Sequence, residues 1–213
     1  MLAAEGVTAE RAATLLRRNC EQPALWRVPR LRRIGSDIVV HQRSEKTEVT
    51  MSALLVHPSR GKKDGRLNAG ISLLRPVRLD AAAAHLLTDD ESLALRKRHG
   101  DSARFWGTYR HNLKKYQRVT EGDPVLFTGG GGIWAVGRIG FQFKNRQFAQ
   151  ALWHSHPEKG VYEYVYSVVD YRPVNIDYEV VNAALGLKPS NHFQAMASYV
   201  DAKADAVIEV LGL

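Results

Sequence analysis

The chain has 213 residues, of which 45% are apolar and 24% charged, and its formal net charge is +8. These values are ordinary for a globular protein with a real core. No apolar run reaches the roughly 18 residues that a membrane span needs. The N-terminus lacks the cationic start and apolar run of a signal peptide. The single cysteine, Cys20, rules out an internal disulfide framework and fits a reducing cytoplasm, so we expect a cytoplasmic protein without a membrane partner.

The positive charge is unevenly distributed along the chain. Residues 1–80 hold 15 Lys/Arg and 8 Asp/Glu, whereas residues 81–213 hold 15 and 14. Within the second part, the segment Arg96–Arg118 has eight basic residues and one acid, Asp101. Clustered positive charge is typical of a protein that binds a polyanion, although ordinary surface charge for solubility is the alternative.

The first part of the chain is predicted to form a small basic N-terminal region. A short amphipathic helix is expected over Thr8–Asn19, with Thr8 as its N-cap. Strands are expected over 36–42 and 48–56, followed by a flexible basic loop or linker over 59–70. A domain boundary near Arg75–Asp80 then separates region 1–79 from a second domain, 80–213.

The second part alternates helical and strand-like patterns, which predicts an α+β fold with a small mixed or barrel-like sheet and peripheral helices. Asp80 can cap a helix, and Thr88 and Glu91 match a capping box before a helix that Gly100 ends. Strands are expected at 104–109, on both sides of a glycine turn within 123–143, and over 161–176. Helices are expected at 112–119, 145–153 and 177–187, with a short strand and a terminal helix capped by Asp201 after them.

The glycine run 129–132 is the first candidate for a phosphate-binding loop. A nucleotide-hydrolysing loop requires Lys followed by Ser or Thr after the glycines, and a dinucleotide fingerprint requires a helix there. Ile133 and Trp134 follow instead, in a strand-like stretch. The pattern therefore favours a hairpin turn with positive φ, and Asp123 is expected to bond local backbone amides before the hairpin.

The aromatic residues near this hairpin suggest a second kind of site. A nucleic-acid base that stacks on an aromatic face gains roughly 1–3 kcal/mol, and a reader of one flipped base combines such faces with a few polar groups. Trp106 lies among basic residues that could hold phosphates, and Trp134 lies on the other side of the turn. The alternative for any single aromatic residue is a place in the core.

A family resemblance rests on the same residues. The stretch FWGTYRHN, the Gly-Asp turn before VLF, the glycine hairpin and the strand IWAVGRI resemble the EVE/YTH-like branch of the PUA superfamily. They are especially similar to specificity domains of modification-dependent restriction systems. The resemblance covers about Ser102–Leu213. It implies a pseudo-barrel that takes a modified base into an aromatic cage, with cage roles for Trp106 and Trp134.

Our main hypothesis is a module that reads a modified base in double-stranded DNA by flipping it into an aromatic pocket. The predicted pocket residues are Trp106, Trp134, Tyr109, Phe105 and Phe141. The residues predicted to contact the backbone are Arg104, Arg110, His111, Lys114, Lys115, Lys62, Lys63 and Arg66.

Two alternatives stay open: an RNA-binding module for a single-stranded or modified nucleotide, and a small-molecule enzyme or regulator. No motif for nucleophilic or nuclease catalysis is found, and neither a cofactor nor a metal is expected. Cleavage in a restriction system would then come from a nuclease or NTPase partner or from a missing segment.

Overall fold

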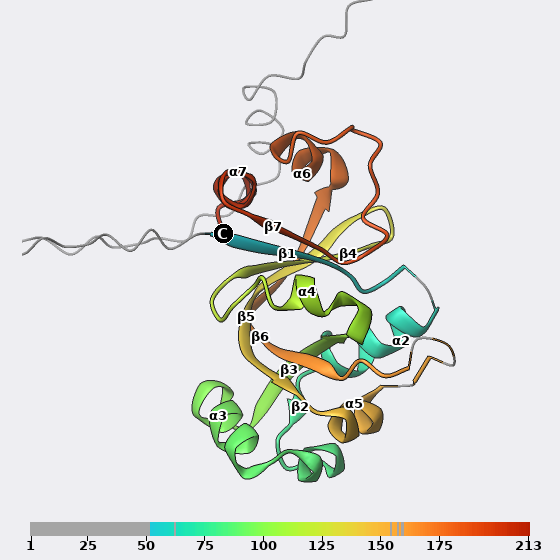
Figure 1. The fold of residues 1–213 in the computed structure, drawn as a ribbon, viewed down its shortest axis with the longest axis vertical. Coiled ribbons are helices and arrows are strands. Elements are labelled where there is room, and N and C mark those ends of the chain that lie inside the picture. Colours follow the sequence, from blue (N-terminus) through green and yellow to red (C-terminus); the bar gives the residue numbers. More distant parts are fainter. Residues whose placement is uncertain (1–51, 62, 154, 157, 159) are drawn as a thin grey trace, which may run out of the picture. The chain divides into compact units, whose positions relative to one another are not determined.

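The computed structural model describes residues 52–213 apart from 62, 154, 157 and 159. These residues belong to a compact unit that spans Met51–Leu213 (Figure 1). The helix predicted at 8–19, the strand predicted at 36–42 and the predicted contact residue Lys62 lie outside the described residues.

The described strands form one mixed sheet in the order β2-β3-β6-β5-β4-β1-β7. Strand β1 runs parallel to β4, and the other neighbouring strands are antiparallel. The register shifts at three points between β5 and β6 and at one between β4 and β5, which bends the long central strands. The strands are β1 (Ala53–Pro58), β2 (Val77–Arg78), β3 (Ser102–Thr108), β4 (Pro124–Gly129), β5 (Gly132–Lys144), β6 (Tyr164–Asp177) and β7 (Ala197–Val200).

Helices cover this sheet at two ends. Figure 1 shows α6 and α7 together beside β7 and β1, and α3 and α5 at the opposite end. No helix within the described ranges is long and apolar enough to cross a membrane. The helices are α2 (Lys63–Ser72), α3 (Asp89–His99), α4 (Leu113–Tyr116), α5 (Arg146–Leu152), α6 (Tyr178–Ala184) and α7 (Ala202–Leu211), with 3-10 turns η1 (Ala82–Leu86) and η2 (Arg110–Asn112).

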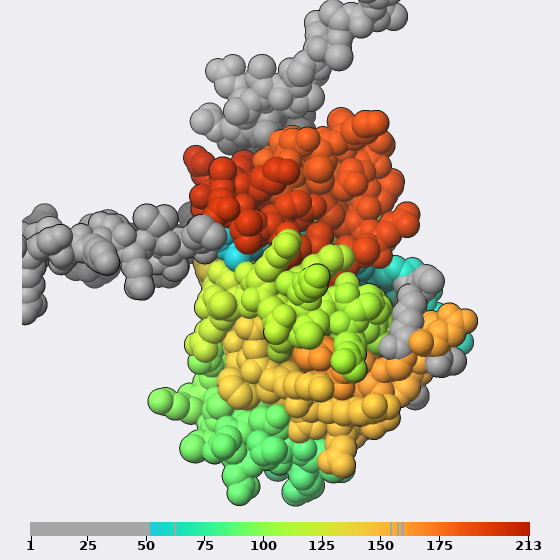
Figure 2. Space-filling model, in the orientation of Figure 1, coloured from blue at the N-terminus to red at the C-terminus, as the bar shows by residue number. Residues whose placement is uncertain are grey.

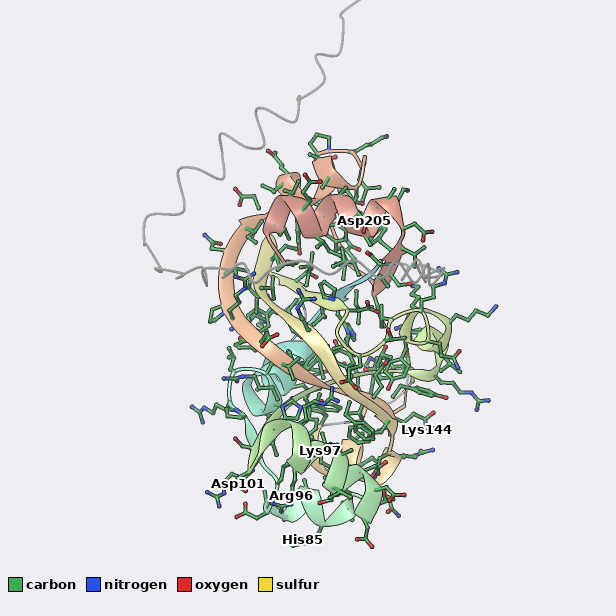
Figure 3. All side chains as sticks on the ribbon, turned by 90° about the vertical axis from the view of Figure 1, so that its left-hand side faces the viewer. His85, Arg96, Lys97, Asp101, Lys144 and Asp205 are labelled. Atoms are coloured by element: carbon green, nitrogen blue, oxygen red, sulfur yellow. The ribbon has the colours of Figure 1, made fainter. Side chains whose placement is uncertain are left out.

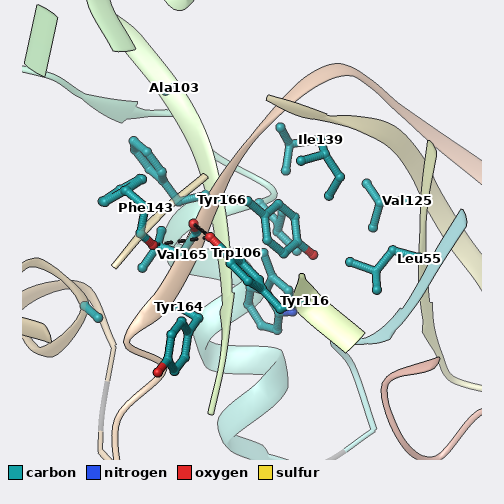
Figure 4. Packing of buried hydrophobic residues seen from close by; sticks show 14 of the residues in the cluster. Leu55, Ala103, Trp106, Tyr116, Val125, Ile139, Phe143, Tyr164, Val165 and Tyr166 are labelled. Atoms are coloured by element: carbon teal, nitrogen blue, oxygen red, sulfur yellow. Dashed lines mark hydrogen bonds between the residues drawn. The ribbon is translucent and has the colours of Figure 1, made fainter. Parts of the chain in front are cut away.

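Two apolar clusters form on the sheet because neighbouring side chains of a strand point to opposite faces. Leu54 and Val56 of β1 belong to the cluster with α6 and α7, whereas Leu55 belongs to the larger cluster with α2, α3 and α5. Figure 4 shows the larger cluster around Trp106 and Tyr166. The fold is therefore α+β with a mixed sheet and peripheral helices, as predicted.

Several local signals in the sequence act as expected. Thr88 and Glu91 form both hydrogen bonds of a capping box at the start of α3. The glycine run is the β4–β5 hairpin, and Gly129, Gly130 and Gly131 all have positive φ, which other residues rarely adopt.

The first half of the predicted organisation needs correction. Strand β1 is the central neighbour of β4 and β7, so the predicted division between residues 79 and 80 does not match the compact unit. Residues 63–70 of the predicted flexible loop 59–70 belong instead to helix α2, whose Ala69 is buried in the larger cluster together with Leu73, which directly follows the helix. The burial of that apolar face outweighs the loop signals of its Gly and Asn residues.

Candidate nucleic-acid interface

An aromatic cleft lies where α2, β3, the end of α5 and the chain before β6 meet. Its lining residues are Asn68, Trp106, Gly107, Trp153 and Tyr162, around an empty volume of about 100 Å³. A side-chain carbon at Gly107 would lie 2.8 Å from the Trp153 ring and 2.9 Å from the carbonyl oxygen of Tyr162. Glycine therefore permits the close packing that brings these rings together. We call this site the aromatic cleft.

A column of three stacked rings leads from the surface to the aromatic cleft. The rings of His111 and Tyr109 lie 5.5 Å apart at 21°, and those of Tyr109 and Tyr162 lie 4.2 Å apart at 27°. His111 is exposed, whereas the two tyrosines are half-buried. Burial first, and then the hydroxyl of Tyr162, raise the pKa of Tyr109, so the phenol stays neutral. Tyr109 stacks on Tyr162, and the Trp106 and Trp153 rings of the aromatic cleft also pack against the Tyr162 ring.

Two residues of the aromatic cleft carry buried polar atoms without a hydrogen-bond partner. Both amide atoms of Asn68 and the indole nitrogen of Trp106 are in this state, and the two residues are only 1% and 2% exposed. The cleft has no room for a water molecule. Each buried group left unpaired costs about 1–3 kcal/mol. Trp153, by contrast, donates its indole N–H to the Ser72 hydroxyl at 3.0 Å.

Behind Trp106 lies a buried histidine that is hydrogen-bonded to a buried tyrosine. His57 contacts the Trp106 ring edge-on at 6.0 Å, and its Nδ1 lies 2.8 Å from the Tyr166 hydroxyl. Burial lowers the pKa of His57 to about 3, so this histidine is neutral at physiological pH. A neutral, hydrogen-bonded histidine gives Trp106 a fixed support.

Basic side chains are exposed on two segments beside the aromatic cleft, helix α2 and the segment formed by η2 and α4. Helix α2 presents some of them on the helix that also carries Asn68, and η2 and α4 present the others directly after Tyr109. The segment with η2 and α4 is yellow-green in Figure 2 and lies on the surface that faces the viewer. The exposed residues with a predicted backbone contact are Lys63, Arg66, Arg110, His111 and Lys114.

Two other residues with a predicted backbone contact have partners within the fold. Lys115 donates to the carbonyl of Met196 at 2.7 Å. Arg104 donates to the carbonyl of Leu73, and its guanidinium lies 4.4 Å from the centre of the Tyr171 ring. Both side chains support neighbouring elements, which makes them less available for a phosphate group than the exposed residues.

The basic segment Arg96–Arg118 is not one surface. Figure 3 shows Arg96, Lys97 and Asp101 at the α3 end of the molecule, opposite Asp205 of α7. Arg96 lies 3.6 Å from the Asp101 carboxylate and donates to a backbone carbonyl. Charge that is continuous in the sequence is therefore divided between α3 and the η2–α4 segment.

Two of the predicted pocket residues pack in or against the larger apolar cluster. Phe105 is fully buried, and its ring packs 5.1 Å from Phe148. Phe141 stacks on Phe143 with the ring centres 5.5 Å apart. Neither residue lines the aromatic cleft. Phe105 alternates with Trp106 along β3 and so points to the other side of that strand.

Trp134 also lies outside the aromatic cleft. Its indole N–H donates to the Ser59 hydroxyl at 2.9 Å, and the Arg60 guanidinium lies 3.7 Å above its ring. It does not line the aromatic cleft, and its polar and aromatic surfaces already have partners. Of the predicted pocket residues, Trp106 lines the cleft and Tyr109 lies behind its Tyr162 wall.

Sequence reasoning missed three residues of the aromatic cleft. Asn68 was placed in a flexible loop, although its helix turns the amide inward. Trp153 and Tyr162 flank the chain between α5 and β6. Their only signal was aromatic character near the Trp106 strand, which does not distinguish a cleft from a core.

Comparison with known proteins supports the fold. No protein-family model and no curated protein sequence matches this chain. A solved structure of the N-terminal domain of McrB from Thermococcus gammatolerans, bound to m5C DNA, is similar with a TM-score of 0.57 and 16% sequence identity. The match covers 76% of this chain and 98% of the McrB domain. At this identity the likeness shows a shared fold.

Proposed function

We propose that the chain binds DNA that carries a modified base, as the specificity part of a modification-dependent restriction system. The observation that carries the proposal is the aromatic cleft with its unpaired polar atoms, Asn68 and Trp106, at the end of a stacked aromatic column. The similar McrB domain, described as bound to m5C DNA, supports the choice of nucleic acid. The predicted relation to the EVE/YTH-like branch is part of the same proposal.

The modified base leaves the duplex and stacks on the face of Tyr162 that is opposite Tyr109. Base–aromatic stacking is worth about 1–3 kcal/mol, which offsets much of the few kcal/mol needed to extrude a base. The Tyr109–Tyr162 stack is built before the base arrives, so little ordering of side chains is needed on that side.

The aromatic cleft has to open for the base to enter. Tyr162 lies 6.1 Å from Trp106 and 5.8 Å from Trp153, measured between ring centres. A flat base with van der Waals contacts of about 3.5 Å on each side needs about 7 Å between its walls. Because these rings are inclined to one another and leave no room for a water molecule, Tyr162 has to move by about the thickness of a base, about 3.5 Å. Tyr162 lies on the chain between α5 and β6 and not within a strand, so this movement breaks no sheet pairing.

The exposed basic residues hold the phosphates on both sides of the extruded base. Lys63 and Arg66 act from α2, and Arg110, His111 and Lys114 act from η2 and α4. Phosphate contacts position the duplex, and the aromatic cleft supplies the discrimination. Cleavage is assigned to a nuclease or NTPase partner or to a further segment.

Competitive binding tests the proposal. The full chain is titrated with duplexes that are identical except for one modified base, and with single-stranded RNA of the same sequence. We expect the modified duplex to bind at least about tenfold more tightly than the plain duplex. Tyr162→Ala should abolish this preference and leave the nonspecific binding. Tyr199→Ala, at another half-buried tyrosine on β7 that lies outside the cleft, is the matched control.

Two results would overturn the proposal. Equal affinity of the wild-type chain for modified and plain DNA removes the modified-base function. Tighter binding of the RNA than of every duplex favours the RNA-binding alternative.

The phosphate contacts have a separate test. Lys63→Ala and Arg66→Ala should each flatten the salt dependence of DNA binding by about one unit of slope. Arg96→Ala, at the α3 end, should leave the slope unchanged. A slope that does not change in the α2 variants would show that α2 does not contact the phosphates.

A further inference from the structure

The unpaired atoms of the aromatic cleft define a hydrogen-bonding pattern. Asn68 supplies one acceptor, its amide oxygen, and a donor, its amide nitrogen. Trp106 supplies one more donor and no acceptor. Folded proteins pair nearly all buried polar groups, and both residues that carry these unpaired atoms line the same small cleft. A ligand that completes the cleft therefore offers two acceptors and at least one donor.

We propose that Asn68 and the indole N–H of Trp106 read the hydrogen-bonding edge of an extruded pyrimidine. The inference rests on the proposed function, because it concerns the base that the aromatic cleft receives. A pyrimidine presents two acceptors and one donor on this edge: cytosine has its amino group, N3 and O2, and thymine has O4, N3–H and O2. Cytosine pairs every unpaired atom when the Asn68 oxygen faces its amino group, whereas thymine, which also carries a methyl on carbon 5, requires the amide turned by about 180°. One fixed amide orientation therefore distinguishes 5-methylcytosine from thymine.

Purines do not complete the same pattern. Adenine presents its amino group and N1 on this edge, followed by a C–H group, so the indole N–H of Trp106 would stay unpaired. Guanine presents two donors and one acceptor, so a donor of the base would face a donor of the cleft. An unpaired or opposed polar group in a buried site is the usual cause of strong discrimination between ligands.

The ring orientations indicate which residue stacks on the base and which one donates to its edge. A base that stacks on Tyr162 lies parallel to that ring, and the planes of Trp106 and Trp153 are inclined to it by 40° and 73°. An indole N–H lies in the plane of its own ring, so a tryptophan that stacks on a base cannot donate to the edge of that base. Tyr162 is thus the stacking face, and Trp106 is a specificity-determining residue that acts through its N–H.

The position of the modification follows from the edge that is read. A methyl group on the amino nitrogen would lie between the base and Asn68 and compete with the hydrogen bonds. A substituent on carbon 5 lies away from O2 and N3 and can contact an aromatic wall. The aromatic cleft therefore takes a cytosine that is modified at carbon 5, with the Asn68 oxygen facing the amino group.

A set of duplexes with one modified position tests the inference. The full chain is titrated with matched duplexes that contain 5-methylcytosine, N4-methylcytosine or N6-methyladenine. We expect 5-methylcytosine to bind at least about tenfold more tightly than the other two. Equal or tighter binding of N6-methyladenine overturns the pyrimidine assignment.

Two buried asparagines provide a matched pair of variants. Asn68 has an unpaired amide, whereas Asn182 is also buried and bonds Pro189 and Asn191. Asn68→Leu should fold at least as stably as the wild type and lose about tenfold or more of the preference for 5-methylcytosine. Asn182→Leu should be less stable and keep the preference at temperatures where it is folded. Retention of the preference in Asn68→Leu overturns the inference.

Different results would contradict the proposed function and the reading of the base edge. If the wild-type chain prefers no modified duplex, the proposed function is wrong. If it prefers a modified duplex but Asn68→Leu binds as the wild type does, the proposed function stands and the reading of the edge is wrong.

Discussion

Trp106 on β3 and Trp134 on β5 belong to the same sheet, with β6 between their strands. Trp134 has a hydrogen bond from its indole to Ser59 and a guanidinium from Arg60 above its ring. Trp106 is almost fully buried, and its indole N–H has no partner. This difference is the basis of our proposal that Trp106, and not Trp134, contacts the ligand.

A fall in pH should have the largest effect on the stability of the fold, because it protonates His57, which supports Trp106. The pKa of His57 is about 3 in the folded chain and about 6.5 in an unfolded chain, so the unfolded chain binds more protons between these values. Stability that is present above about pH 6.5 is therefore lost as the pH falls toward 3, by about 1.4 kcal/mol for each pH unit in that window.

Urea unfolding at pH 7 and pH 4 measures this effect. His57→Gln should be less sensitive to the pH change than the wild type, since glutamine does not titrate. If the wild type and His57→Gln lose the same stability between pH 7 and pH 4, other groups cause the acid sensitivity. The support of Trp106 would then not depend on a neutral His57.

The packing of the aromatic cleft should show the next largest effect. Gly107→Ala places a methyl group against the Trp153 ring and should lower the free energy of unfolding by about 1–3 kcal/mol. Gly70→Ala in α2 is the control, because no atom lies within 4 Å of the added carbon. It should raise stability by about 0.4–1 kcal/mol. Equal effects of the two variants in thermal unfolding would show that the cleft is less tightly closed than described.

The smallest expected loss of stability comes from removing the hydrogen bond of the Trp134 indole. Ser59→Ala removes the hydroxyl that accepts its indole N–H and should lower stability by about 1 kcal/mol. The preference for modified DNA should not change, because Trp134 lies outside the aromatic cleft. Chemical unfolding and DNA titration of the same variant measure both quantities. A lost preference with unchanged stability would exchange the roles of the two tryptophans.

Local features of the fold could be predicted from the sequence. The capping box at Thr88, the glycine hairpin and the long strand that became β6 depend on residues close together in the chain. The place of β1 could not be predicted, because its parallel partner β4 is far away in the sequence. Helix α2 was missed because Gly65 and Gly70 resemble loop residues until the burial of Ala69 and Leu73 is known.

Residues of the candidate site could be predicted only where the signal lies in nearby sequence. Trp106 and Tyr109 stood out because they are aromatic residues within a basic stretch. Asn68 and Tyr162 could not be assigned, since their role arises from the contact of segments distant in sequence. The unpaired state of the Trp106 indole is a property of the packed structure, and no local pattern predicts it.

The most direct test follows the indole N–H signals of the protein by NMR during titration with modified and plain duplexes. Trp106→Phe and Trp134→Phe assign the two signals. The account predicts that the Trp106 signal shifts strongly and becomes protected from hydrogen exchange with the modified duplex only, while the Trp134 signal changes little with either DNA. A Trp106 signal that responds equally to both duplexes, or to neither, would contradict the claim that this cleft receives the modified base.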